Sequence, residues 1–200
     1  MDKLVHLHTH SHYSLLDGLS KVDQLIDKAK EYGMEALAIT DHGNIYGAVE
    51  FFKKAKKANI KPIIGLEAYV AARSRFDKEP GIDSTRYHLT LLVKNKTGYK
   101  NLVQLITKSH LEGFYYKPRI DRELLEQHHE GLICLSGCFT SELSRALEKK
   151  DLKKAREVAK FHQDLFGDDY YIELQPQPTS REYIPEQLAI AKELDIQTVV

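Results

Sequence analysis

Short apolar segments and amphipathic segments alternate along the whole chain. Apolar runs with strand-like composition predict seven strands, at residues 3–8, 36–40, 63–70, 88–93, 131–136, 170–175 and 197–200. Apolar residues spaced three and four apart predict helices at about 21–32, 45–58, 96–110, 122–129, 140–148, 152–166 and 181–194. Polar segments at 71–86 and 114–119 are predicted loops. Strands that alternate with helices indicate a parallel α/β architecture.

Polar side chains follow several of these predicted strands. His8 and His10 come after the first strand, Asp41 and His42 after the second, and Glu67 lies late in the third. Parallel strands bring their carboxyl ends to one edge of a sheet or barrel, where active groups collect. We therefore expect side chains from distant parts of the chain to converge on one mouth, together with the segment 136–138 after the fifth strand.

The pair His8 and His10 is the first candidate for metal binding. In an extended chain, residues two apart point to the same side, and neutral imidazole is a favoured ligand of Zn, Mn and Fe. A strand edge that happens to be rich in histidine is the alternative. Asp17, followed by Gly18, adds a carboxylate after a turn, although Asp-Gly by itself indicates only the turn.

Two further residues, His42 and Glu67, extend this candidate site. Asp41 is predicted to cap the helix that follows it, which leaves His42 unexplained. Glu67 lies in an apolar strand, where an unpaired carboxylate is costly, so it either contacts metal ions or faces solvent.

His88 and Cys138 complete the candidate set. Taken singly, a histidine at the start of a strand is more often structural, and a lone cysteine is usually a small buried hydrophobe. A nucleophilic Cys-His pair has no further support in the sequence. As part of a mixed set of nitrogen, oxygen and sulfur ligands, the two residues favour Zn or Mn over Mg.

Composition narrows the functional classes. The chain has 200 residues, of which 42% are hydrophobic and 29% charged, and its formal net charge is zero. Nucleic-acid binding driven by overall positive charge is therefore excluded. Without an apolar run of membrane-spanning length or a signal peptide, we expect a cytoplasmic protein that makes no membrane contact. Cys134 and Cys138 are expected to form neither a disulfide nor a zinc knuckle.

Several sequence motifs, taken together, resemble those of one particular protein family. They cover residues 6–18, 40–44, 47–51, 61–69, 87–92, 112–121 and 131–138. With these segments, essentially the whole chain resembles the N-terminal PHP (polymerase and histidinol phosphatase) domains of bacterial DNA polymerase III alpha subunits. The resemblance implies one domain over residues 1–200, folded as a distorted (β/α)7 barrel with up to three divalent metal ions, Zn, Mn or Fe, in its mouth.

The resemblance also assigns ligands. His8, His10, Asp17, His42, Glu67, His88 and Cys138 match family ligand positions, with Glu67 in a bridging role and Cys138 where many relatives have histidine. His6 and His12 are expected to lie behind the ligands or at the surface. The last two of nine family ligands lie in an Asn-Asp-x-His segment after a strand like 197–200. Because the sequence ends at Val200, we expect this centre to be incomplete.

The activity implied is metal-dependent phosphoester hydrolysis, as a proofreading 3′–5′ exonuclease on DNA within a DNA-directed DNA polymerase. Arg119 and Lys117, near two tyrosines, are candidate contacts to the substrate, unless their loop packs on the barrel or on a polymerase domain. The implied partners are the DNA 3′ end, the polymerase domains of the parent chain and other replisome subunits. An inactive scaffold that binds partners is the alternative, and a small-molecule phosphatase like histidinol phosphatase is disfavoured.

Overall fold

The computed structural model describes residues 4–200, in which the strands form one curled, eight-stranded sheet. The longest strand of this sheet is β2 (Lys61–Ala71). The others are β1 (Ala36–Ile39), β3 (Arg86–Val93), β4 (Phe114–Tyr115), β5 (Lys117–Ile120), β6 (Leu132–Leu135), β7 (Tyr170–Glu173) and β8 (Gln197–Val199). Their order is β4-β5-β2-β3-β6-β7-β8, with β1 beside the first half of β2.

Strand direction differs from the expected parallel arrangement. β1 and β5 run parallel to β2, and β7 and β8 continue in parallel from β6. β3, however, is antiparallel to both β2 and β6. The physical reason is the connection at residues 72–85, which contains no helix that could carry the chain back to the far end of the sheet. The expectation of an all-parallel sheet was therefore wrong at β3.

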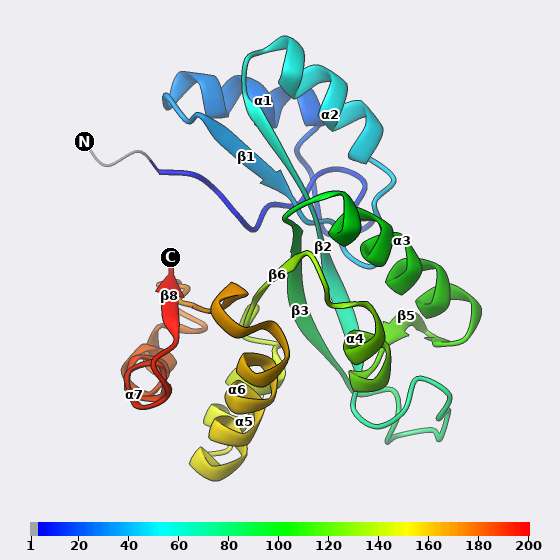
Figure 1. Ribbon diagram of the computed structural model, residues 1–200, viewed down its shortest axis with the longest axis vertical. Helices are drawn as coiled ribbons and strands as arrows, with labels where there is room; N and C mark the ends of the chain where they lie inside the picture. The colour runs from blue at the N-terminus through cyan, green and yellow to red at the C-terminus, as the bar shows by residue number, and fades with distance from the viewer. Residues whose placement is uncertain (1–3) are drawn as a thin grey trace.

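The helices lie outside the curled sheet in three groups (Figure 1). α1 (Val22–Glu31) and α2 (Ala48–Lys57) lie beside β1, and α3 (Lys96–Leu111) packs with α4 (Arg122–His128). The third group contains α5 (Glu142–Glu148), α6 (Leu152–Phe166) and α7 (Ile184–Leu194). Short 3-10 turns at Gly167–Asp169 and Arg181–Tyr183 precede β7 and α7. None of the helices in residues 4–200 has the length and apolar character required to cross a membrane.

The N-terminal segment follows β1 without forming a regular strand. The Ala38 N–H donates to the His6 carbonyl at 2.9 Å, and the Thr40 N–H donates to the Thr9 carbonyl at 2.8 Å. The strand predicted at 3–8 is therefore wrong for residues 4–8, because only isolated hydrogen bonds join this segment to β1; residue 3 lies outside the described part. In Figure 1 the segment runs from the edge of the molecule towards the middle of the sheet.

Two smaller differences concern loops. The segment 114–119, predicted as a loop, is largely a tight β4–β5 hairpin, whose turn residue Tyr116 has a φ of +59°. Asp41 does not cap α2, which begins only at Ala48. Its carboxylate instead accepts hydrogen bonds from the Ser11 N–H at 2.6 Å and the Ser11 hydroxyl at 2.8 Å.

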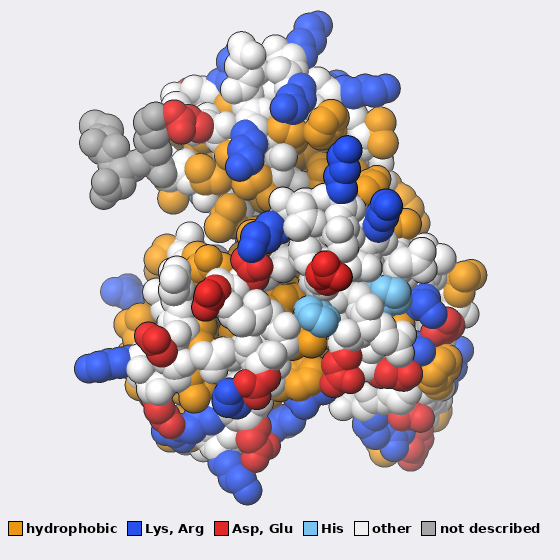
Figure 2. All heavy atoms as spheres, viewed as in Figure 1, with side chains coloured by type: hydrophobic (Ala, Val, Ile, Leu, Met, Phe, Trp, Pro, Cys, Tyr) orange, Lys and Arg blue, Asp and Glu red, His pale blue; other side chains and the backbone are white. Residues whose placement is uncertain are grey.

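A surface hollow of about 590 Å³ lies between α2 and the start of α3. Apolar side chains line most of it, including Val49, Phe52 and Tyr99, with Lys53 and Lys100 beside them. Hydrophobic and basic side chains gather over this part of the molecule in Figure 2.

Candidate metal centre

The centre is built on β2, at the point where the chain after β1 joins it. The segment after β1 continues alongside β2 in a parallel bridge between His42 and Glu67. The Gly43 N–H donates to the Glu67 carbonyl at 3.0 Å, and the Glu67 N–H donates to the Asp41 carbonyl at 3.2 Å. The backbone thus fixes His42 beside Glu67, as the prediction from strand ends requires.

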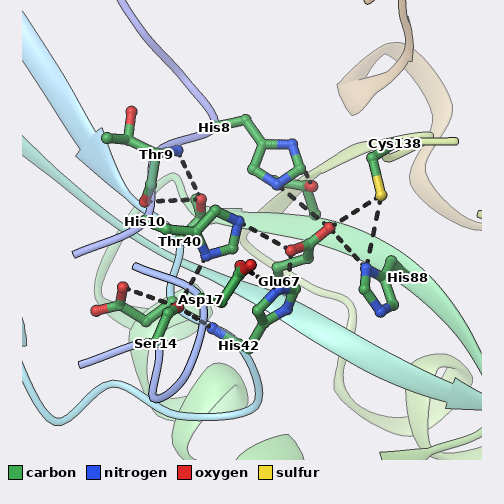
Figure 3. Close-up of polar contacts among 12 residues, drawn as sticks. His8, Thr9, His10, Ser14, Asp17, Thr40, His42, Glu67, His88 and Cys138 are labelled. Atoms are coloured by element: carbon green, nitrogen blue, oxygen red, sulfur yellow. Dashed lines mark hydrogen bonds and ion pairs between the residues drawn. The ribbon is translucent and has the colours of Figure 1, made fainter. Parts of the chain in front are cut away.

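Glu67 is the hub of the site (Figure 3). Its side chain is only 2% exposed, although it carries a carboxylate. Five side chains from distant segments approach that carboxylate: His8 Nε2 at 3.3 Å, His10 Nε2 at 3.0 Å, His42 Nδ1 at 2.9 Å, His88 Nδ1 at 3.0 Å and Cys138 Sγ at 3.3 Å. The structure therefore brings six of the seven candidate ligands into one cluster, and Glu67 does not face solvent.

Asp17, the seventh candidate, reaches the cluster from a tight loop. Its Oδ2 lies 3.0 Å from His42 Nε2, and its side chain is 57% exposed. The loop closes through a hydrogen bond from the Gly18 N–H to the Ser14 carbonyl at 2.8 Å. A Cβ on Gly18 would lie only 1.9 Å from the Ser11 carbonyl oxygen, so only glycine allows the chain to turn here.

Ser14 and Asp41 hold this loop against the rest of the site. The Ser14 hydroxyl pairs with His10 Nδ1 at 2.8 Å and accepts from the His42 N–H at 2.9 Å. Because the Nδ1 atom of His10 is engaged, its Nε2 atom faces Glu67. The sequence analysis did not single out Ser14 and predicted Asp41 only as a helix cap, so it gave no sign that these two residues anchor the loop.

His88 reaches the cluster because β3 is antiparallel to β2. In the antiparallel pairing, His88 at the start of β3 lies opposite Tyr69 near the end of β2. A parallel β3 would have placed His88 at the opposite end of the sheet. The Tyr69 ring stacks on His42 with centroids 5.5 Å apart and meets the His88 ring edge-on at 5.2 Å.

Cys138 enters through a turn after β6. Gly137 has a φ of +85°, and a Cβ there would lie 2.9 Å from the His88 carbonyl oxygen. Glycine therefore lets the turn approach β3 closely enough for Cys138 Sγ to lie 3.5 Å from His88 Nδ1. Cys134, in contrast, is fully buried in β6, and both cysteines are free, as expected.

Glu173, at the end of β7, belongs to the site although the sequence analysis missed it. Its Oε1 lies 2.8 Å from His8 Nδ1, which leaves His8 Nε2 directed at Glu67. A carboxylate behind a ligating histidine fixes the ring orientation and makes the other nitrogen a better ligand. A glutamate two residues before the predicted end of a strand was the available signal.

The charges in the cluster depend on one another. Burial lowers the pKa of His8, but hydrogen bonds to Glu173 and Glu67 outweigh burial and raise that pKa to about 10. Burial also lowers the pKa of His42, but the nearby carboxylates of Glu67 and Asp17 outweigh burial and raise it. Burial raises the pKa of Glu67, yet the surrounding imidazoles hold it well below its usual range. Burial, followed by the charge of Glu67, raises the pKa of the Cys138 thiol to about 12.

The donor atoms fit divalent metal ions. Among residues 4–200, three overlapping groups place their ligand atoms within 4.8 Å of one another: His8, His10 and Glu67; His10, Asp17 and His42; and His42, Glu67 and His88. His42 Nδ1 is buried and lies 2.9 Å from Glu67 Oε2, but it has no well-oriented hydrogen-bond partner in the described chain. His42 Nδ1 and Glu67 Oε2 thus lie close together without a good hydrogen bond between them. Two ligands of one metal ion would be placed in the same way.

Residues 6–177 match the PHP domain family. The chain belongs to the PHP domain family. It is 52% identical over 181 residues to the DNA polymerase III subunit alpha of Thermus aquaticus, covering 86% of this chain and 14% of the relative. It is 50% identical over 200 residues to that of Treponema pallidum, covering 98% of this chain and 17% of the relative. The chain therefore spans only about 14–17% of the length of these relatives.

Solved structures agree with this fold. An amidohydrolase from Chromobacterium violaceum superposes with a TM-score of 0.59 at 15% identity, covering 97% of this chain and 84% of the other. A putative metal-dependent phosphoesterase from Bifidobacterium adolescentis gives a TM-score of 0.55 at 13% identity, covering 99% and 86%. The expected distorted barrel of the PHP type is thereby confirmed, and within residues 4–200 it takes the form of a curled sheet with helices outside.

The two predicted substrate contacts of the PHP domain have different surroundings. Arg119 is fully buried, and its guanidinium donates to the carbonyls of Gly113, Asp83, Arg75 and Asp77. Arg119 therefore holds loop 72–85 against β5, and its predicted contact with substrate was wrong. Lys117 is half-buried, with its Nζ 5.7 Å from the centre of the Tyr69 ring, so it stays a candidate at the edge of the site.

Proposed function

We propose that this PHP domain is a metal-dependent phosphoesterase that removes nucleotides from the 3′ end of DNA. The observation that carries the proposal is the convergence of four imidazoles and a thiol on the buried Glu67 carboxylate. A buried carboxylate surrounded by histidines is costly as a structural device but ordinary as a metal site. The roughly 50% identity to polymerase subunits favours DNA over a small phosphate ester as the substrate.

In this proposal the ligands are the seven residues His8, His10, Asp17, His42, Glu67, His88 and Cys138, for up to three ions in the complete domain. When bound, such ions lower the pKa of a water molecule and polarise a phosphoryl group. The protein contributes orientation: Glu173 fixes the His8 ring, and Ser14 fixes the His10 ring. The mixture of imidazole, carboxylate and thiol favours Zn, Mn or Fe over Mg.

The same relatives suggest which longer protein contains this domain, which partners it has and where it works. We propose that residues 1–200 form one domain of a DNA polymerase III alpha subunit and that polymerisation resides elsewhere in that longer chain. The partners would be the DNA 3′ end, the polymerase domains of the same chain and other replisome subunits. A protein that acts on replicating DNA would work in the cytoplasm.

A cleavage assay tests the proposal. A longer version of the chain that also contains the expected Asn-Asp-x-His ligand segment is loaded with Mn and incubated with single-stranded DNA labelled at its 3′ end. We expect release of single labelled nucleotides, and we expect Glu67→Gln to abolish it. Metal content measured by mass spectrometry on the same samples shows whether the tested protein held metal.

The other outcomes identify different functions. A metal-loaded protein that leaves both DNA and histidinol phosphate intact would be a scaffold for partner binding, and the proposal would fail. Rapid release of phosphate from histidinol phosphate, with no cleavage of DNA, would assign the domain to the small-molecule phosphatases.

A further inference from the structure

A groove beside His88 has the chemistry of a binding site for a nucleic-acid strand. It encloses about 450 Å³ and lies between the start of β3 and α5. Hydroxyl-bearing and cationic side chains line much of it, among them Thr85, Arg86, Thr140, Arg145 and Lys149, with the Glu148 carboxylate at the end of α5. One end is thus formed by a candidate metal ligand, while the other reaches the end of α5.

Arg86 is the first cation of this groove. Arginines elsewhere in residues 4–200 commonly pair with carboxylates, as Arg122 does with Glu142 at 3.1 Å. Within this described chain Arg86 has no such ion pair; its guanidinium donates to the Ser84 carbonyl at 3.0 Å and lies 5.6 Å from the centre of the Tyr69 ring. Since that ring packs on both His42 and His88, Arg86 adds positive charge next to the metal centre.

Charged side chains form the far wall, and an exposed aromatic ring outside the lining lies beside one of them. Lys149 is exposed, and Arg145 is paired with Glu148 at 2.8 Å. The Arg145 guanidinium also lies 5.9 Å from the centre of the Phe139 ring, which is 39% exposed and follows Cys138 directly in the chain. Cations along a groove with an aromatic ring beside them are the usual arrangement for binding single strands, in which phosphates pair with cations and bases stack.

We propose that this groove binds the phosphates of the nucleotides next to the 3′-terminal one in single-stranded DNA, with one base stacked on Phe139. The proposal rests on the proposed function, because the terminal phosphodiester must lie at the metal centre for the strand to continue past His88. It also explains how a chain of zero net charge holds DNA: a local pair of cations, Arg86 and Lys149, replaces an overall basic surface.

The test measures DNA binding in the presence of chelator, where no cleavage occurs. The probe is a fluorescent 12-residue oligothymidylate, and anisotropy gives Kd at several salt concentrations. Arg86→Ala and Lys149→Ala should each weaken binding and lower the slope of log Kd against log salt by about 0.7, the value for one phosphate contact on a single strand. Phe139→Ala should weaken binding at least about fivefold but leave the slope unchanged, because stacking releases no counterions.

The matched control is Lys30→Ala on α1, an exposed lysine far from the groove in sequence, which should leave both Kd and slope unchanged. Melting temperatures of all variants show that each one folds, and Arg86→Lys, which keeps the charge, should retain the wild-type slope. Equal binding by wild type and groove variants, or no binding by wild type, would overturn the groove. The proposal would also be overturned if polyglutamate displaced the probe and bound more weakly to the Arg86 and Lys149 variants than to wild type. An acidic peptide would then be the better ligand of the groove.

Failure of the groove and failure of the proposed function give different results. If the wild-type protein cleaves 3′-labelled DNA with Mn while the groove variants bind and cleave like wild type, only the groove is wrong. If wild-type protein loaded with metal cleaves no DNA, the proposed function is wrong, and with it the reason for a strand to lie in this groove.

Discussion

At the scale of single residues, Glu67 determines the character of the site. One buried carboxylate balances imidazoles that come from three separate segments, and two of these imidazoles have a second partner that fixes the ring. Glu173 does this for His8 and Ser14 for His10. The centre is therefore held in shape by side-chain hydrogen bonds before any ion enters, as metal sites with a supporting shell are.

Replacement of Glu67 by glutamine should remove metal binding. The amide has nearly the same shape, but it lacks the charge that the surrounding histidines share, and it binds divalent ions weakly. We expect the metal content to fall to less than one ion per chain, measured by mass spectrometry after dialysis. An unchanged metal content in a folded Glu67→Gln protein would show that the ions bind elsewhere.

Glu173 should affect metal affinity without touching a metal. Glu173→Ala frees the His8 ring, and loss of such a supporting carboxylate typically weakens metal binding by about 10- to 100-fold. Glu173→Gln keeps an oxygen that can accept from His8 Nδ1, so it should restore most of the affinity. Competition with a chelator of known affinity measures both; equal affinity of all three proteins would contradict the supporting role.

At the scale of secondary-structure elements, the sequence predicted most helices and strands but not their directions. α6 was predicted with the bounds 152–166 that the structure shows, because its apolar spacing and caps are local properties. The reversal of β3 and the partnership of His8 with Glu173 were not predictable, since each depends on pairing between distant residues. For the same reason the buried position of Arg119 was missed: its four carbonyl partners come from a loop and a turn whose courses the sequence leaves open.

Arg119 should be needed for the stability of loop 72–85. Arg119→Lys keeps the charge but cannot reach carbonyls on several sides with one ammonium group, so we expect a loss of roughly 2–4 kcal/mol in the free energy of unfolding. Urea denaturation measures that loss, and faster trypsin cleavage at Lys78 would locate it in the loop. Arg156→Lys, at an exposed pair with Glu193, is the control and should change stability by less than about 1 kcal/mol. A stable, protease-resistant Arg119→Lys protein would contradict the role of this arginine.

At the scale of the whole molecule, the metal centre ties together parts of the chain that pack in different cores. α1, α2 and β1 enclose one cluster of buried side chains, whereas α3, α4, α5 and α6 cover another. The cluster around Glu67 takes residues from the N-terminal segment, β2, β3 and the turn after β6. Ions bound there would therefore stabilise the arrangement of both halves.

Metal removal should lower the melting temperature. An ion present at about 100 times its Kd adds about 2.7 kcal/mol to the free energy of unfolding, which corresponds to roughly 5–10 °C for a domain of this size. Calorimetry with and without chelator measures the difference, and added Mn or Zn should reverse it. Identical melting curves would show that the folded state binds no metal.

Acid should destabilise the fold partly through His162, which lies in α6 and is not among the candidate metal ligands. Burial lowers the pKa of His162 from 6.5 to about 4, so the ring is neutral in the folded protein. Well above pH 6.5 the His162 ring is neutral in both the folded and the unfolded chain. It then has no effect on how the free energy of unfolding depends on pH. As pH falls from 6.5 towards 4, only the unfolded chain takes up the proton, which costs the fold about 2 kcal/mol at pH 5.

His162→Phe removes this proton uptake while keeping a ring against Tyr170. Urea unfolding at pH 7 and pH 5 should show a smaller loss of stability for the variant than for wild type, by about 2 kcal/mol. All other ionisable groups are the same in both proteins, so the difference isolates His162. Equal losses would mean that the buried ring is protonated in the fold.

The reversal of β3 has a consequence for how this protein can change over evolution. Because β2 ends and β3 begins at the edge of the metal centre, the connection at 72–85 joins the strands that carry Glu67 and His88 on that side of the sheet. Insertions or deletions in this connection would reshape the entrance while leaving the hydrogen bonding of both strands intact. A change in loop length would therefore alter the entrance to the site without altering any of the candidate metal ligands.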